Sequence, residues 1–111
     1  MTLEDTQRAA RKGRQISSGG VIFRQRDGIV EVALISVKGG KIWALPKGMN
    51  EEGENIARTA HREVREETGL DGKILNKIGH IEYFFTIKDE SGSIRLFKIV
   101  YFFLMEYTSG D

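Results

Sequence analysis

The 111-residue sequence contains no cysteine, which excludes disulfide bonds, zinc–thiolate sites and cysteine nucleophiles. Long apolar runs are also absent. The longest unbroken one, Ile99 to Met105, is far too short to span a membrane. The first five residues lack the basic-then-apolar pattern of a signal peptide. We therefore expect a cytoplasmic protein without membrane association.

A large excess of charge of one sign is missing as well, since the formal net charge is +1. Nothing in the overall charge favours nucleic acid or membrane as a partner. With 40% hydrophobic and 30% charged residues, the composition is typical of one soluble globular domain with a modest core. Charge is concentrated locally, because residues 47–71 hold seven acidic and four basic residues.

The stretch from Gly48 to Leu70 contains most of the residues with chemical potential. Ile56, Ala60 and Val64 recur at helical spacing, so the sequence predicts an amphipathic helix from Asn55 to about Thr68. Gly69 follows directly, where glycine can adopt the left-handed conformation that ends a helix. Because Pro46 disfavours helix at the preceding residue, an extended segment and a loop over residues 47–53 should lead into this helix.

Three glutamates break the amphipathic pattern of the predicted helix. At about 100° per residue, Glu67 lies in the apolar arc, and Glu63 and Glu66 border it. Like charges spaced three and four residues apart destabilise a helix by a few tenths of a kcal/mol per pair. A hard divalent cation would offset this repulsion, and Mg²⁺ is typically held by carboxylates together with substrate phosphates.

These residues also carry a family resemblance. Gly48, Glu54 and the run Arg62 to Leu70 resemble the complete Nudix box, and Trp43 to Lys47 resembles the entry to that box. The resemblance covers roughly residues 14–107. It implies an α/β (α+β) fold, a mixed β-sheet sandwich with the box helix on one face. It also implies a Mg²⁺-dependent pyrophosphohydrolase, with Mn²⁺ as a substitute.

The resemblance, together with the helix pattern, assigns roles within the box. The expected metal ligands are oxygen donors of the box: Glu63, Glu66, Glu67, Glu54 and the backbone carbonyl of Gly48. Either Glu66 or Glu67 is expected to deprotonate water, and Arg62 to orient Glu66 through a charge-assisted hydrogen bond. Glu54 has an alternative role, which is to brace the loop.

Three residues outside the helix are candidates for substrate binding. Lys47 offers a positive charge to a phosphate, and Tyr83 and Phe84 offer rings for a nucleobase. A solvated lysine and buried aromatic rings remain the alternative interpretations. His61 is expected to face solvent, and His80 is expected to be a surface residue rather than a base.

Segments outside the box resemble the dinucleoside polyphosphate branch of the family. They are Gly19 to Phe23, Gly79 to Phe84 and Lys98 to Phe102. Diadenosine polyphosphates are therefore the first substrate hypothesis. An RNA 5′ end, a diphosphoinositol phosphate and a modified nucleoside triphosphate are the alternatives. A non-catalytic nucleotide-sensing module and an RNA-binding protein are two further hypotheses. Apart from an RNA 5′ end, nucleic acid is not an expected partner.

The remaining pattern predicts strands at Gln15–Arg24, Val30–Val37, Lys73–Ile87 and Ile94–Tyr107. A hairpin turn is expected at Arg26-Asp27-Gly28, and the Gly19-Gly20 pair predicts a bulge or a close backbone approach. In the third strand, the face that carries Ile81 and Tyr83 is interpreted as core.

The domain is predicted to cover residues 14–111, preceded by an N-terminal arm at 1–13. Both faces of the last strand are apolar, yet no second amphipathic helix follows the box. This pattern predicts a C-terminally truncated domain whose bare sheet face is hidden by self-association.

Overall fold

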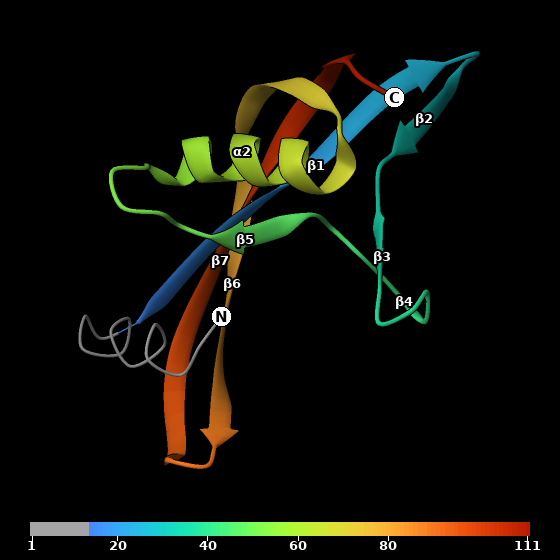
Figure 1. The fold of residues 1–111 in the computed structure, drawn as a ribbon. Helices are drawn as coiled ribbons and strands as arrows, with labels where there is room; N and C mark the ends of the chain where they lie inside the picture. The colour runs from blue at the N-terminus through green and yellow to red at the C-terminus, as the bar shows by residue number, and fades with distance from the viewer. Residues whose placement is uncertain (1–13) are drawn as a thin grey trace.

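A computed structural model of the chain describes residues 14–111. Along the chain lie five strands, one helix and two long strands (Figure 1): β1 Gln15–Arg26, β2 Ile29–Val32, β3 Ile35–Val37, β4 Ile42–Ala44, β5 Lys47–Met49, α2 Ile56–Thr68, β6 Asp71–Asp89 and β7 Gly92–Ser109. Within the described residues α2 is the single helix. The expected α+β class is confirmed. The predicted arm at 1–13 lies outside the described residues.

The main sheet has the strand order β2-β1-β7-β6, and β5 pairs with β1 outside this path. β1 runs parallel to β7, whereas β2 and β5 lie antiparallel to β1. β6 and β7 form a long antiparallel hairpin, and β3 and β4 form a separate two-stranded sheet. The sheet is therefore mixed, and β6 is one of its edges.

Helix α2 begins and ends as its sequence predicts. Asn55 caps the start, since its side chain accepts a hydrogen bond from the Arg58 N–H at 2.9 Å. Gly69 ends the helix in the left-handed conformation, with φ 75°, and its N–H donates to the Arg65 carbonyl. The predicted helix from Asn55 to about Thr68 is confirmed.

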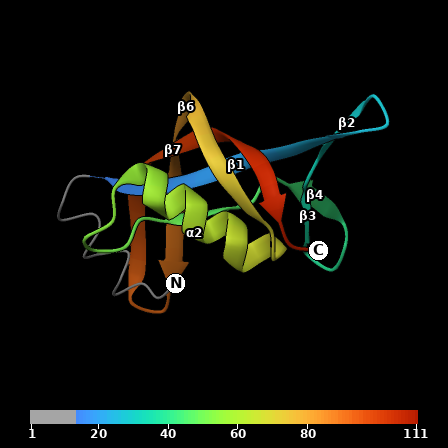
Figure 2. The same ribbon diagram turned by 90° about the horizontal axis from the view of Figure 1, so that it is seen from above.

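Helix α2 lies on one face of the main sheet, across β1 and β7 (Figure 2). Its apolar side buries Ala60 and Val64, and Val64 packs with Ile22 of β1 and Met105 of β7. Gly20 permits this packing, because a Cβ at this position would lie 2.8 Å from Val64 and 2.7 Å from the Met105 sulfur.

Gly19 makes the second close approach, on the side of β1 toward β5. A Cβ there would lie 2.2 Å from the Pro46 carbonyl oxygen, and Gly20 N–H donates to that oxygen at 3.2 Å. The close approach predicted for the glycine pair is confirmed. β5 can therefore lie against β1 and carry Gly48 to the helix.

Two predicted elements differ from the structure. The strand expected at Val30–Val37 is divided, and its halves pair in different sheets. The division falls at Ala33, whose N–H donates to the Ile22 carbonyl and whose side chain packs against the core. The loop expected at residues 47–53 begins as β5, because residues 47–49 pair with residues 17–19 of β1.

The interpretation of Ile81 and Tyr83 as core is wrong. Ile81 is 52% exposed and Tyr83 is 38% exposed. Both lie on the edge strand, on the opposite side of the sheet from α2. On β7, by contrast, Val100 and Phe103 are buried although they point to opposite faces. The large exposed apolar residues lie elsewhere, on β2, β4, β6 and the segment that leads into β3. The predicted truncation and the self-association through the sheet face opposite α2 stay predictions.

In the described part of the chain, no helix is long and apolar enough to cross a membrane.

Candidate active site

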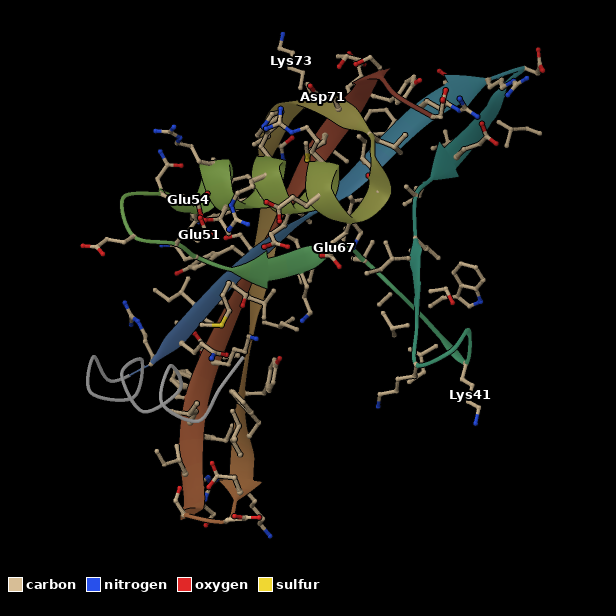
Figure 3. All side chains as sticks on the ribbon, in the orientation of Figure 1. Lys41, Glu51, Glu54, Glu67, Asp71 and Lys73 are labelled. Carbon is tan, nitrogen blue, oxygen red and sulfur yellow. The ribbon has the colours of Figure 1, made fainter. Side chains whose placement is uncertain are left out.

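The acidic residues of the box gather on the flank of α2 that faces β5 (Figure 3). Glu63 and Glu67 lie closest to that strand. Glu67 Oε1 accepts a hydrogen bond from the Lys47 backbone N–H at 2.8 Å. The Glu63 carboxylate lies directly over Gly48, where an added Cβ would be 2.1 Å from its Cδ. Only glycine at residue 48 leaves room for this carboxylate.

Arg62 holds the acidic residues in a shared network. Its Nε donates to Glu54 Oε2 at 2.6 Å, and one terminal nitrogen donates to Glu63 Oε1 at 2.8 Å. That nitrogen also reaches Glu66 Oε2 at 3.2 Å. The other terminal nitrogen donates to the Met49 carbonyl at 2.9 Å and to Glu54 Oε1 at 3.0 Å. The guanidinium group of Arg62 therefore connects α2 to β5 and to the loop before the helix.

Glu54 is the strongest partner of Arg62, which the sequence did not indicate. The hydrogen bond from Arg62 is the main reason that the pKa of the Glu54 carboxyl falls to about 2. Oε1 of Glu54 also accepts from the Glu51 N–H and from the Thr59 hydroxyl, both at 2.9 Å. With both oxygens engaged within the loop and helix, Glu54 fits the bracing role better than the role of a metal ligand.

The oxygen atoms near Gly48 fit a hard divalent cation by their chemistry. Glu63, Glu66 and Glu67 offer carboxylate oxygens, and Glu66 is 57% exposed, so its side chain can turn toward an ion. Partial desolvation raises the pKa of the Glu67 carboxyl, and the neighbouring charge of Glu63 adds to the rise. Among residues 14–111, no three acidic or imidazole side chains yet converge in the geometry of a metal site. A bound cation would have to draw the glutamates together.

Two lysines face the sheet side opposite α2. Lys47 pairs with Gly19 and Lys98 pairs with Gln15, so both side chains belong to one face of the sheet. Burial lowers the pKa of the Lys98 ammonium to about 8, and the charge of Lys47 lowers it further. Within the described chain, neither lysine forms a salt bridge. Two cations without a carboxylate partner favour an anionic ligand.

The candidate rings, Tyr83 and Phe84, lie on opposite faces of β6. Tyr83 pairs with Lys98 and shares the face of the two lysines. Phe84 pairs with Phe97, at a ring-centroid distance of 5.2 Å, on the face that α2 occupies. Of the two, only Tyr83 is placed beside the lysines.

Lys98 and Ser17 were not predicted as site residues from the sequence. Ser17 lies between Gln15 and Gly19 on the lysine face, is fully buried, and has no hydrogen-bond partner for its hydroxyl within the described residues. A signal for Lys98 was present, since it is the one charged residue in the run from Leu96 to Met105. No sequence pattern marks Ser17.

The two histidines lie apart from the glutamates. His61 was expected to face solvent, but it is half-buried and its Nε2 lies 2.7 Å from Asp71 Oδ1. This pair connects α2 to the start of β6. His80 is on the surface, as expected, and its Nε2 lies 3.2 Å from Glu82 Oε1.

Comparison with curated proteins gives relatives that are longer than this chain. A putative mutator protein MutT4 from Mycobacterium tuberculosis is 34% identical over 103 residues, which are 87% of this chain and 40% of the relative. An RNA pyrophosphohydrolase from Sphingopyxis alaskensis is 36% identical over 72 residues, 63% of this chain and 46% of the relative. The chain thus spans less than half the length of either relative.

Solved structures share the fold. A mutator MutT protein from Bacillus halodurans superposes with a TM-score of 0.65 at 27% identity, covering 87% of this chain and 59% of that one. A Caenorhabditis elegans Ap4A hydrolase gives 0.63 at 24% identity, covering 86% and 70%. The sequence itself matches the NUDIX domain over residues 13–111. The box helix, its glycine-supported glutamates and these matches agree, and the chain belongs to the NUDIX domain family.

Proposed function

We propose that this domain hydrolyses a phosphoanhydride bond in a nucleoside diphosphate linked to another moiety, with a divalent cation, Mg²⁺ or Mn²⁺, bound at the box. Nudix hydrolases generally use divalent metals and act on small nucleotides. The observation that carries the proposal is the close approach of Glu63 to Gly48, with Glu67 held by the Lys47 N–H. This arrangement packs carboxylates together at a cost that a cation would offset.

The cation, the glutamates and Arg62 have different roles in the proposed reaction. A bound cation would neutralise phosphate oxygens and favour the loss of a proton from water. Glu66 or Glu67 takes that proton. The water oxygen then forms a bond to phosphorus while the bond from phosphorus to the bridging oxygen breaks, and the leaving phosphate carries the freed electron pair. Arg62 holds Glu63 and Glu66 in place.

Diadenosine polyphosphates are the leading substrate candidates. Lys47 joins the carboxylate cluster to the lysine face, since its backbone N–H holds Glu67 while its side chain shares a face with Lys98. A substrate with several phosphates would extend from the glutamates toward these two ammonium groups. Tyr83, on the same face, is positioned near the end of such a chain.

A second candidate is the 5′ end of RNA, favoured by the similarity to the RNA pyrophosphohydrolase over 72 residues. Its triphosphate would use the same glutamates and lysines. The two candidates differ in the group attached beyond the phosphates, which is a second nucleoside in one and a chain of nucleotides in the other.

A substrate panel tests the proposal. Diadenosine tetraphosphate, 5′-triphosphorylated RNA, a diphosphoinositol phosphate and a modified nucleoside triphosphate are incubated with Mg²⁺, with Mn²⁺ and with chelator. We expect metal-dependent release of phosphate or nucleotide, fastest with diadenosine tetraphosphate. Binding of nucleotide without turnover of any substrate would instead identify a non-catalytic sensing module.

A further inference from the structure

We propose that the sheet face occupied by α2 carries a second binding surface, specific for single-stranded nucleic acid and adjoining the carboxylate cluster. We call it the basic–aromatic face, and it consists of Arg58, Arg65, Lys77, His80, Phe84 and Arg95. Two independent features support it: a groove along α2 and a row of stacked cations and rings along β6 and β7.

The groove lies on the flank of α2 that faces β6. Arg58, His61 and Arg65 are spaced by three and four residues, so they line one side of the helix. With Ile74 of β6 they border a groove of about 490 Å³, whose lining also includes Glu54 and Arg62. The glutamates of the box lie on the flank toward β5, as Figure 3 shows for Glu67. The groove therefore adjoins the proposed active site through Glu54 and Arg62, whereas Glu63, Glu66 and Glu67 do not line it.

The row continues along the β6–β7 hairpin. Register places Lys77, His80 and Phe84 of β6 opposite Phe103, Tyr101 and Phe97 of β7, all on the α2 face. The Lys77 ammonium lies 5.6 Å from the centre of the Tyr101 ring, and the His80 ring lies 5.6 Å from it. At the far end, the Arg95 guanidinium lies 4.6 Å from the centre of the Phe84 ring, which is 61% exposed.

The charges on the basic–aromatic face are not balanced. Of the carboxylates beside it, Asp71 and Glu82 contact the imidazoles of His61 and His80, and Glu54 accepts hydrogen bonds from Arg62. By contrast, Arg58, Arg65, Lys77 and Arg95 form no salt bridge within residues 14–111. Four cations thus lack a salt-bridge partner and can contact an anion, and one of them, Arg65, also helps to lower the pKa of the Asp71 carboxyl.

The exposed ring of Phe84 beside the cations favours nucleic acid over a simple anion or an acidic peptide. Single strands are bound by positive grooves that follow the backbone and by aromatic side chains on which bases stack. Phe84 offers such a ring, backed by Arg95 and Phe97. The phosphates of the strand would contact Arg58, Arg65 and Lys77. Contacts to phosphate do not distinguish between bases, so we expect binding that is independent of sequence.

A labelled 12-nucleotide oligouridine with a 5′-hydroxyl tests this surface. It has no phosphoanhydride bond, so its binding does not depend on the proposed hydrolysis. Affinity is measured by fluorescence anisotropy over a range of salt. Arg58→Ala with Arg65→Ala should weaken binding about tenfold and reduce the salt slope by about 1.4, since each phosphate contact contributes about 0.7 on a single strand.

The matched control is Lys41→Ala with Lys73→Ala, which removes the same charge from other surfaces. Lys41 lies in the β3–β4 turn, and Lys73 points to the sheet face opposite α2 (Figure 3). We expect this control to weaken binding by about twofold at most. Phe84→Leu should weaken binding at least about fivefold with an unchanged salt slope, since stacking is not electrostatic.

Circular dichroism verifies that each variant is folded, and polyglutamate and inorganic phosphate serve as competitors. The proposal is overturned if the control loses as much affinity as the arginine pair. It is also overturned if polyglutamate competes with the labelled RNA as effectively as unlabelled RNA does. The face would then bind polyanions without preference for nucleic acid. Hydrolysis of a small dinucleotide by the arginine variant is measured separately, so failure of either proposal is distinguishable.

Discussion

At the scale of single residues, Gly48 determines how closely β5 approaches α2. Gly48→Ala would bring a Cβ to 2.1 Å from the Glu63 carboxylate carbon, so the carboxylate must move. We expect at least a tenfold loss of turnover and weaker metal binding by calorimetry. Gly79→Ala is the matched control, because a Cβ at Gly79 meets nothing within 4 Å. Equal activity of the two variants would show that the position of Glu63 does not matter.

Arg62 joins more partners than any other residue of the site. Arg62→Ala removes the guanidinium group that donates hydrogen bonds to Glu54 and Glu63. We expect the free energy of unfolding to fall by about 3 kcal/mol, as when one partner of a buried ion pair is removed. Arg62→Lys should recover only part of this loss, since an ammonium cannot reproduce the fork. Chemical denaturation measures both variants. Full recovery with lysine would reduce the role of Arg62 to that of a charge.

Loss of the Lys98 charge at high pH should stabilise the fold but weaken the binding of a polyphosphate substrate. Its pKa of about 8 is below the ordinary 10.5, so the unfolded chain binds the proton more tightly. Stability should therefore rise from pH 8 to about 10.5, and Lys98→Met should abolish the rise. The KM for a polyphosphate substrate should increase over the same range as the charge is lost. A KM that does not change with pH while stability rises would remove Lys98 from the substrate site.

At the scale of elements, the start of α2 depends on one side chain. Asn55→Ala removes the cap on the Arg58 N–H and should cost about 1 kcal/mol of unfolding free energy. Asn76→Ala is the control, since Asn76 is exposed and donates only to the adjacent Lys77 carbonyl; its effect should stay within about 0.5 kcal/mol. Thermal or chemical denaturation measures the difference. Equal costs would mean that the cap contributes nothing.

The elements also show what the sequence could predict. Helix α2 was predictable because capping, apolar spacing and the terminal glycine agree, and the turns at Asp27-Gly28 and Gly92 follow from residues that tolerate positive φ. The short strands were not predictable from the sequence. Whether residues 47–49 form a loop or β5 depends on pairing with β1, a contact distant in sequence. The exposure of Ile81 depends on β6 being an edge, and alternation alone does not reveal this.

The residues of the site also divide into those that the sequence predicts and those that it does not. The glutamates and Gly48 were recognisable from their spacing, because one helix and one loop position them. The partnership of Glu54 with Arg62 and the effect of the Lys47 charge on Lys98 depend on tertiary contacts. Lys98 lies fifty-one positions after Lys47 in the chain, on a strand that only the parallel pairing of β1 and β7 brings near.

At the scale of the whole molecule, α2 separates two surfaces of different charge. One flank presents Glu63 and Glu67 toward β5, and the other presents Arg58 and Arg65 toward β6. Arg62 contacts the glutamates and also lines the groove on the second flank. The sheet beneath adds the lysine face on its far side. The central claim is that the glutamate flank is a cation-dependent hydrolytic site.

The most direct measurement of that claim is the Mg²⁺ dependence of diadenosine tetraphosphate turnover in the parent chain, Glu66→Gln and Glu67→Gln. We predict turnover in the parent that chelator abolishes, and a loss of at least about a hundredfold in each variant, as when one charge-stabilising group is removed from a transition state. Both variants should be no less stable than the parent without metal, because a like-charge repulsion is relieved. Near-normal Mg²⁺-dependent turnover in both variants would contradict the claim.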